Sequence, residues 1–260
     1  MAKNENSGLS GYWKFDEEGG RTVKDSSGKN NHGSIFPDNS KFETWGTSNF
    51  AGTLSLSGKD GNHVQVKASD SLNEIRKAIT VVAHFYPRSF PTKEELQVNI
   101  YANYLSVVQR QWAQATHPDL YYLGFGPNNV HGPEGVLHYK WHLGLTLPDG
   151  TEGEADLYIK FDSAPILPNC WVHMVGTYEG DSGLMRLYLN GVSIGERIFP
   201  GEIRIDEQSK ERPLVIGCEL NADGPAGNID AYVDEVRIYN RVLSEEEIKS
   251  LAHTQGQARK

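Results

Sequence analysis

The chain has 260 residues, a formal net charge of −9 at pH 7 and a hydrophobic content of 38%, which is enough for one ordinary core. The acidic balance excludes a polyanion such as nucleic acid as a partner, because nucleic acid requires a basic surface. No apolar run approaches the roughly 20 residues that a membrane span needs, so we expect no membrane insertion.

Short segments that read as strands, separated by turn-forming residues, follow one another along most of the chain. LSGYWKFD, residues 9–16, is the first, and the β-branched and aromatic run ITVVAHFY, residues 79–86, is the clearest. Asn190-Gly191 joins two strand-like runs and predicts a β-hairpin. The whole pattern predicts an all-β fold, a β-sandwich of the jelly-roll kind.

One helix is clearly signalled after the last predicted strand. Ser244 can cap it, and Glu247, three residues later, completes a capping box. Leu243 and Ile248 are spaced for a hydrophobic staple across the first turn. We therefore expect a short C-terminal helix that follows the sandwich directly.

Several segments, in their order along the chain, resemble a known family. GYWKFDEEGG with DSSGKNNHG resembles the opening of laminin-G-like domains in the concanavalin A-like lectin/glucanase superfamily, and LSGKDGNHVQV resembles their second signature. WVHMVGTYEGDSGLMRLYLNGV is similar to the central hairpin of the family, and PLVIG and VDEVRIYNRVLSEEEI resemble its last strands and terminal helix. The resemblance implies a jelly roll of two curved antiparallel sheets with a short C-terminal helix.

The resemblance also implies the domain organisation and the setting. Residues 9–253 would form a single laminin-G-like domain, with a disordered or tag-like segment at 1–8 and a tail at 254–260. The parent protein would be secreted or displayed on the cell surface, although the quoted N-terminus carries no signal peptide. Most domains of the family are binding or accessory modules, and the fold alone does not settle activity.

The region at about 86–165 is longer than the compact family pattern, so we expect the features particular to this chain to lie there. In GVLHYKWHLGL, strand alternation puts His138, Lys140 and His142 on one face and Trp141 on the other. Aromatic faces in this region are candidates for stacking on a pyranose ring. For a noncatalytic, lectin-like module that binds a polysaccharide or oligosaccharide, the predicted contact residues are Trp112, Trp141, His138, Lys140, His142 and Arg110.

A polysaccharide lyase acting on uronic-acid polymers is the alternative function. β-Elimination needs one group that neutralises the sugar carboxylate, one base and one acid. His138, His142, Arg110 and Tyr122 are the residue types that could fill these roles. A second alternative is a protein-interaction or adhesion domain, and for the binding module itself we predict no catalytic residue.

Two other kinds of site are disfavoured by spacing. A retaining glycosidase of this superfamily carries alternating carboxylates on one strand face, but in EIRIDE Arg204 stands between Glu202 and Asp206. A zinc site is disfavoured because His138 and His142, on one strand, are about 13 Å apart. A glycoside hydrolase would therefore need carboxylates from distant strands.

The last strand raises the question of an aspartate on an apolar face. In AYVDEVRIY, alternation puts Asp234 on the same face as Val236 and Ile238, and a buried carboxylate needs a partner. The partner could be a neighbouring strand or Lys14, or it could be a cation.

A structural Ca²⁺ is the cation that fits best. The first and last strands of such a fold lie close together, so Asp16 and Asp234 would repel without a cation between them. Calcium prefers carboxylate and carbonyl oxygens, and the Lys-Asp-Gly-Asn turn at 59–62 offers both. The predicted ligands are Asp16, Asp60 and Asp234, with Asn62 as an addition. The alternative is that each aspartate caps a turn.

Two cysteines, Cys170 and Cys218, do not make a disulfide framework. We expect two small buried thiols, and the alternative is a bridge, which would imply an oxidising compartment. His173, in WVHMV, is expected to be a core histidine whose ring nitrogens have partners.

Overall fold

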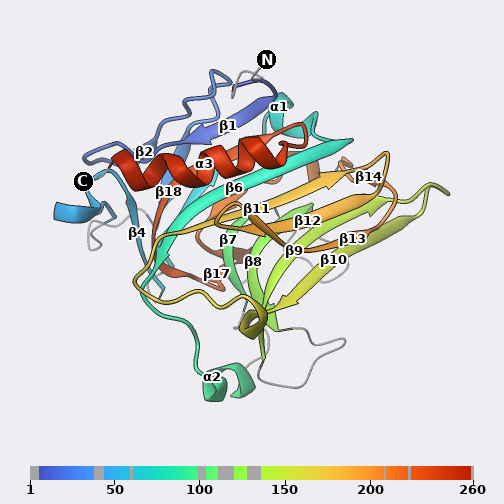
Figure 1. The fold of residues 1–260 in the computed structure, drawn as a ribbon. Helices are drawn as coiled ribbons and strands as arrows, with labels where there is room; N and C mark the ends of the chain where they lie inside the picture. The colour runs from blue at the N-terminus through green and yellow to red at the C-terminus, as the bar shows by residue number, and fades with distance from the viewer. Residues whose placement is uncertain are drawn as a thin grey trace.

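The computed structural model describes residues 6–37, 44–58, 61–98, 104–110, 120–127, 136–207, 209–221 and 224–258. Two large antiparallel sheets face each other across a shared hydrophobic core (Figure 1), which confirms the predicted sandwich. Helices in this part of the chain are too short or too polar to cross a membrane.

The seven-stranded sheet follows the order β1, β18, β6, β11, β12 and β13, with β4 paired to β18. The first and last strands of the chain are therefore neighbours, as predicted, and Asn190-Gly191 connects β12 to β13. The strands are β1 (Leu9–Trp13), β4 (Leu54–Ser57), β6 (Ala78–Pro87), β11 (Val172–Glu179), β12 (Leu184–Leu189), β13 (Val192–Ile198) and β18 (Asp230–Tyr239).

The nine-stranded sheet follows the order β10, β9, β8, β7, β15, β5, β3 and β2, with β14 paired to β9. Four of its strands come from the long region at 86–165, and they are β7 (Leu105–Arg110), β8 (Tyr121–Pro127), β9 (Leu137–Thr146) and β10 (Glu152–Lys160). The others are β2 (Thr22–Val23), β3 (Gly33–Phe36), β5 (His63–Val66), β14 (Glu202–Ile203) and β15 (Leu214–Ile216).

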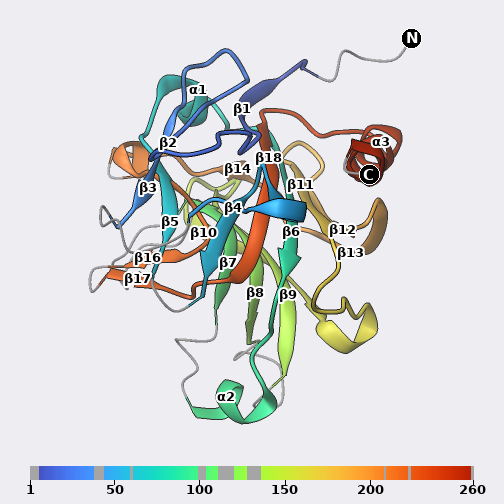
Figure 2. The same cartoon turned by 90° about the vertical axis from the view of Figure 1, so that its left-hand side faces the viewer.

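Smaller elements complete the fold. A two-stranded hairpin, β16 (Glu219–Asn221) and β17 (Gly224–Ala226), lies beside β3 and β5 on the side of the molecule away from α3 (Figure 2). The sequence did not predict the short helices α1 (Asp70–Asn73) and α2 (Lys93–Val98) or the 3₁₀ turns at Ser48–Phe50, Phe161–Ser163 and Ser209–Glu211.

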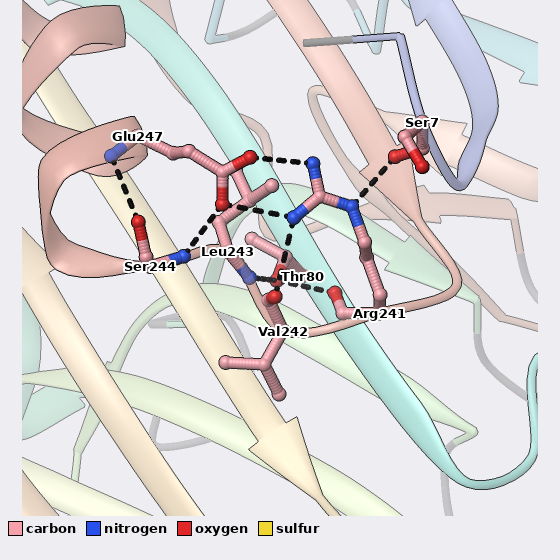
Figure 3. Close-up of polar contacts among 7 residues, drawn as sticks. All are labelled: Ser7, Thr80, Arg241, Val242, Leu243, Ser244 and Glu247. Carbon is pink, nitrogen blue, oxygen red and sulfur yellow. Dashed lines mark hydrogen bonds and ion pairs between the residues drawn. The ribbon is translucent and has the colours of Figure 1, made fainter. Parts of the chain in front are cut away.

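The helix α3 (Glu245–Ala258) packs on the outer face of the seven-stranded sheet (Figure 1). Its start is fixed by the predicted capping box: Glu247 N–H donates to Ser244 Oγ at 3.3 Å, and Ser244 N–H donates to Glu247 Oε2 at 2.8 Å. Arg241 clamps the same Glu247 with two hydrogen bonds, and the Thr80 hydroxyl of β6 accepts the Leu243 N–H (Figure 3). The helix is thereby tied to the sheet before its apolar face begins.

The last strand contains an irregularity that moves Asp234. Glu235 has a positive φ of 51°, and the pairing of β18 with β6 shifts register just after Asp234. Val236 and Ile238 therefore face the core, whereas Asp234 lies on the outer face of the sheet, opposite His84. The prediction that these residues share one face is wrong for this reason. Asp234 is still buried, and its carboxylate accepts the Glu235 N–H at 2.9 Å.

The expectations for the thiols and for His173 are only partly met. Cys218 is buried, but Cys170 is exposed, and both thiols are free. His173 is buried on the outer face of the seven-stranded sheet, with its ring 4.4 Å from that of His84. Its two ring nitrogens have no hydrogen-bond partner among the described residues, so the expectation of a satisfied core histidine is wrong.

Candidate functional site

A pocket of about 500 Å³ opens on the outer face of the nine-stranded sheet, where β3 and β5 meet the β16–β17 hairpin. Phe36 supplies a half-buried aromatic ring, and Gln65 and Asn228 supply uncharged polar groups. Small-ligand pockets commonly measure about 300–1,000 Å³ and combine apolar walls with a few polar groups. The pocket therefore has the size and the composition of a small-ligand site.

A short chain of hydrogen bonds fixes the floor of this pocket. His63 Nδ1 donates to the Gly61 carbonyl at 2.6 Å, so His63 Nε2 is left to accept the Gln65 amide N–H at 2.9 Å. Burial lowers the pKa of His63, which keeps the ring neutral near pH 7. The Gln65 amide is consequently held in one orientation beside the Phe36 ring, which stacks on His63 at 5.8 Å.

A row of polar side chains crosses the same outer face on β10, β9, β8 and β7. Asp156 pairs with His142, His142 with Tyr122, and Tyr122 with Gln109. Across β15 the row reaches Gln65, which lines the pocket. The pocket and this row form one continuous surface, which we call the polar face.

Lys140 lies beside this row, held by aromatic rings. Its ammonium nitrogen is 4.9, 5.2 and 5.6 Å from the ring centroids of Tyr104, Tyr122 and Tyr158. The same nitrogen is 4.0 Å from Asp156 Oδ1, and Lys140 is only 8% exposed. Cation–π attraction and the carboxylate together stabilise the buried charge.

The carboxylate of Asp156 also orients His142. His142 Nδ1 donates to Asp156 Oδ1 at 2.9 Å, and His142 Nε2 has no hydrogen-bond partner among the described residues. Burial acts to raise the pKa of Asp156, but the His142 hydrogen bond and the nearby Lys140 lower it below its usual value. His142, Glu154 and Asp156 are the described cluster whose ligand atoms lie close enough to share a metal ion, all within 4.8 Å.

Several buried polar atoms on the polar face have no hydrogen-bond partner within the described part of the chain. They are Ser106 Oγ, both amide atoms of Gln109, His142 Nε2 and Asn228 Oδ1. Each unpaired buried atom of this kind costs about 1–3 kcal/mol. Water or the hydroxyl groups of a ligand can supply the missing partners.

Three of the predicted contact residues lie where the sequence placed them. His138, Lys140 and His142 share the outer face of β9, whereas Tyr139, Trp141 and Leu143 face the core. Trp141 is 0% exposed, its ring lies against Gly176 of the opposite sheet, and its indole N–H donates to the Thr177 carbonyl at 3.0 Å. The prediction that Trp141 stacks on a sugar is wrong, because both faces of its ring are buried in the core.

The prediction that Arg110 contacts the ligand on this face is also wrong. It pairs with Tyr121, whose side chain is in the core, so Arg110 points away from the polar face. Its guanidinium is fully buried and donates to the carbonyl groups of Leu72 and Arg212 at 3.0 and 3.1 Å. The four lyase candidates, His138, His142, Arg110 and Tyr122, therefore do not converge, since Arg110 lies on the other side of the sheet.

The remaining predicted residues concern stacking and calcium. Trp112 and Asp60 lie outside the described residues. Asp16 is exposed, and the Asn62 side chain is occupied locally, because it accepts from Ser57 N–H at 3.0 Å and donates to the Ser55 carbonyl at 2.7 Å. Adjacency of the first and last strands is the feature that still favours calcium.

Five residues of this surface were not predicted from the sequence, namely Phe36, His63, Gln65, Gln109 and Asn228. Their side chains come from β3, β5, β7 and the segment after β17, which are far apart in the chain. The pairing of β3 with β5 sets Phe36 directly opposite His63, and no local motif carries that information.

Comparison with known proteins identifies a family and a fold. The profile of the concanavalin A-like lectin/glucanases superfamily matches residues 57–249. No curated protein sequence matches the chain. The binding domain of Paraclostridial Mosquitocidal Protein 1 aligns with 98% of this chain and 54% of its own, at 16% identity and a TM-score of 0.64.

Two further solved structures with a similar fold are complexes with ligands. Domain 4 of AbnA, a GH43 extracellular arabinanase from Geobacillus stearothermophilus, in complex with arabinotriose, aligns with 94% of this chain and 98% of its own, at 15% identity and a TM-score of 0.59. The binding domain of botulinum neurotoxin DC, in complex with SialylT, aligns with 96% and 52%, at 14% identity and a TM-score of 0.54. The chain spans about half the length of the two toxin domains, and at these identities the likeness concerns the fold.

Proposed function

Because the chain belongs to the concanavalin A-like lectin/glucanases superfamily, we propose that it is a noncatalytic, lectin-like module that binds an oligosaccharide or polysaccharide on the polar face. The observation that carries this proposal is the pocket of about 500 Å³, in which a half-buried Phe36 ring lies beside the oriented amide of Gln65. Ring C–H groups of a sugar are attracted to the electron-rich face of an aromatic ring, and its hydroxyls need fixed polar partners.

The polar row extends the same surface beyond the pocket. Gln109, Ser106 and His142 present atoms that accept or donate hydrogen bonds and have no partner among the described residues. A chain of sugar units could occupy the pocket with one unit and meet this row with the next. Binding by several weak subsites would suit a module that holds a polymer without cleaving it.

We also propose that the parent protein binds its glycan outside the cell or at the cell surface. Support comes from the analogy with a domain of an extracellular arabinanase, which shares the fold.

Binding to glycans tests the proposal directly. We expect retardation in gels that contain a polysaccharide, from a panel of neutral ones, such as arabinan, xylan, galactan and β-glucan, and acidic ones, such as polygalacturonate, with no release of new reducing ends. The substitutions Phe36→Ala and Gln65→Ala should each weaken binding, measured by calorimetry, by about tenfold, which is the effect of losing roughly 1.4 kcal/mol.

The control for aromatic loss is Trp171→Ala, which removes a half-buried ring from the outer face of the other sheet. Its affinity should equal that of the unchanged protein. Failure of every polysaccharide to bind, or equal losses in Phe36→Ala and Trp171→Ala, would overturn the proposed site.

A further inference from the structure

We propose that the ligand of the polar face is an uncharged glycan and that this surface rejects glycans bearing carboxylates, such as uronates and sialylated chains. The inference rests on the proposed function, because it names the ligand class of the same surface. It follows from the charges and the hydrogen-bonding states of the groups that line the polar face.

The buried cation of the polar face is already neutralised. Lys140 lies 4.0 Å from Asp156 Oδ1 and has three tyrosine rings around its ammonium group. The burial of a second carboxylate beside a pair that is already balanced carries a desolvation penalty that no further charge offsets. Lys140 is therefore a structural crosslink between β9 and β10.

Other cations near the polar face are turned away, bonded to backbone carbonyls or exposed at the ends of strands. Arg21, beside the pocket, donates to the Ile35 carbonyl at 2.7 Å and to the Pro37 carbonyl. Arg110 faces the opposite side of the sheet, and Arg197 donates to the Asp156 backbone carbonyl at 3.1 Å. Lys67 and Lys160 are exposed, at the ends of β5 and β10, where water and salt screen their charge.

The carboxylates around the polar face repel a second anion. Asp156 is ionised, because the His142 hydrogen bond and Lys140 lower its pKa, and Glu154 is exposed two residues earlier on the same face of β10. A ligand carboxylate placed on the row would approach both of them. The whole chain has a net charge of −9, which also repels an approaching polyanion.

The unpartnered atoms match hydroxyl groups. His142 Nε2 is buried without a partner among the described residues, while its Nδ1 donates to Asp156. A hydroxyl can donate to Nε2 or accept from it, whichever form the ring takes, whereas a carboxylate can only accept. Gln109 offers both a donor and an acceptor, and Ser106 does the same through one hydroxyl. A sugar hydroxyl also donates and accepts at once, so it satisfies these groups where a carboxylate satisfies only the donors.

Matched glycan pairs test the inference. Oligogalacturonate and its carboxyl-reduced product share a backbone and differ in charge, as do sialyllactose and lactose. By calorimetry, we expect the neutral member of any pair that binds to be at least about tenfold tighter. Affinity for the neutral member should change little as NaCl is raised, because the interaction contains no ion pair.

A substitution in the protein reverses the preference. Asp156→Asn keeps an acceptor for His142 but leaves the charge of Lys140 without its carboxylate, so the acidic member of each pair should gain about tenfold in affinity. Adding Lys140→Met to Asp156→Asn should abolish that gain. Asp181→Asn, at an exposed turn between β11 and β12, is the control, and its preference within each pair should equal that of the unchanged protein.

The outcomes separate this inference from the proposed function. Tighter binding of the acidic member by the unchanged protein would overturn the inference and leave the carbohydrate-binding function standing. Absence of binding to every neutral and acidic glycan would overturn both. Tighter neutral binding, with the preference reversed by Asp156→Asn, would support both.

Discussion

On the seven-stranded sheet, α3 covers much of the outer face, with Ile248 and Leu251 packed among Val82, Val175 and their neighbours. On the nine-stranded sheet, the outer face carries a pocket of about 500 Å³ and buried polar atoms that have no partner in the described part of the chain. The two sheets belong to one sandwich (Figure 2), and their inner faces share one hydrophobic core. The outer side chains, and not the fold, therefore distinguish a sheet whose face is packed for stability from one whose face we propose to bind a ligand.

Aromatic content alone does not distinguish the two faces. On the seven-stranded sheet, Phe50 stacks on Tyr232 with centroids 4.1 Å apart and planes 9° from parallel, and Tyr86 and Trp171 join the same cluster. The other two pairs meet edge to face, so each ring of the cluster contacts another ring. On the nine-stranded sheet, Phe36 has one face on His63 and lines an open pocket. We infer that availability of a ring face separates a packing aromatic from a binding one.

The largest expected effect tests whether the seven-stranded face is structural. Ile248 of α3 is fully buried against that face, so Ile248→Ala should lower the free energy of unfolding by about 2–5 kcal/mol. Denaturant unfolding gives that change, and calorimetry at a temperature where the variant is folded should give unchanged affinity for the glycan. A loss of affinity without a loss of stability would break the comparison, because it would place the binding site under α3.

A smaller effect comes from acid and again separates the faces. Burial lowers the pKa of His173 to about 3, whereas an unfolded histidine has a pKa near 6.5. Below pH 6.5 the histidine binds a proton in the unfolded chain but not in the folded chain, which favours unfolding. The contribution of the neutral His173 to the free energy of unfolding is therefore complete above pH 6.5 and is lost as the pH falls toward 3. The loss amounts to about 1.4 kcal/mol per pH unit.

Thermal unfolding between pH 7 and pH 4 measures this dependence. His173→Gln should flatten the decline in melting temperature, because glutamine does not titrate, and His253→Gln, at an exposed position on α3, is the control. An equally steep decline in His173→Gln would show that the buried histidine does not limit acid stability.

Much of the fold could be predicted from local patterns, because strand alternation and turn residues act over a few neighbours. The capping box of Ser244 and Glu247 and the hairpin turn at Asn190-Gly191 are such local features, and both were predicted. Asp234 was predicted on the wrong face of β18 because a bulge at Glu235 shifts the alternation of the strand. Glu235 has a φ of 51°, and no glycine in the sequence marks this position as a bulge.

The site was harder to predict because it depends on register between distant strands. Gln109 and Arg110 are both polar neighbours on β7, and only the pairing of Gln109 with Tyr122 decides that the glutamine, and not the arginine, lies on the polar face. Trp141 was predicted to stack on a sugar, although strand alternation placed it on the other face of β9 from His138 and Lys140. One of those two faces had to form the core, and the more apolar face did.

The smallest expected effect is on stability and concerns the proposed calcium ion, which would bind at Asp234 and further stabilise the seven-stranded sheet. Extracellular modules bind calcium with a Kd of about 10⁻⁴–10⁻³ M, so about 1 mM calcium would add roughly 0.4–1.4 kcal/mol through binding to the folded state alone. Melting temperature with calcium and with EDTA measures this gain. Asp234→Asn should remove it, and Asp181→Asn, at an exposed turn, should retain it. Equal melting temperatures with calcium and with EDTA would contradict the calcium proposal. Asp234 would then be a buried carboxylate that accepts the Glu235 N–H, and calcium would contribute nothing to the stability of the seven-stranded face.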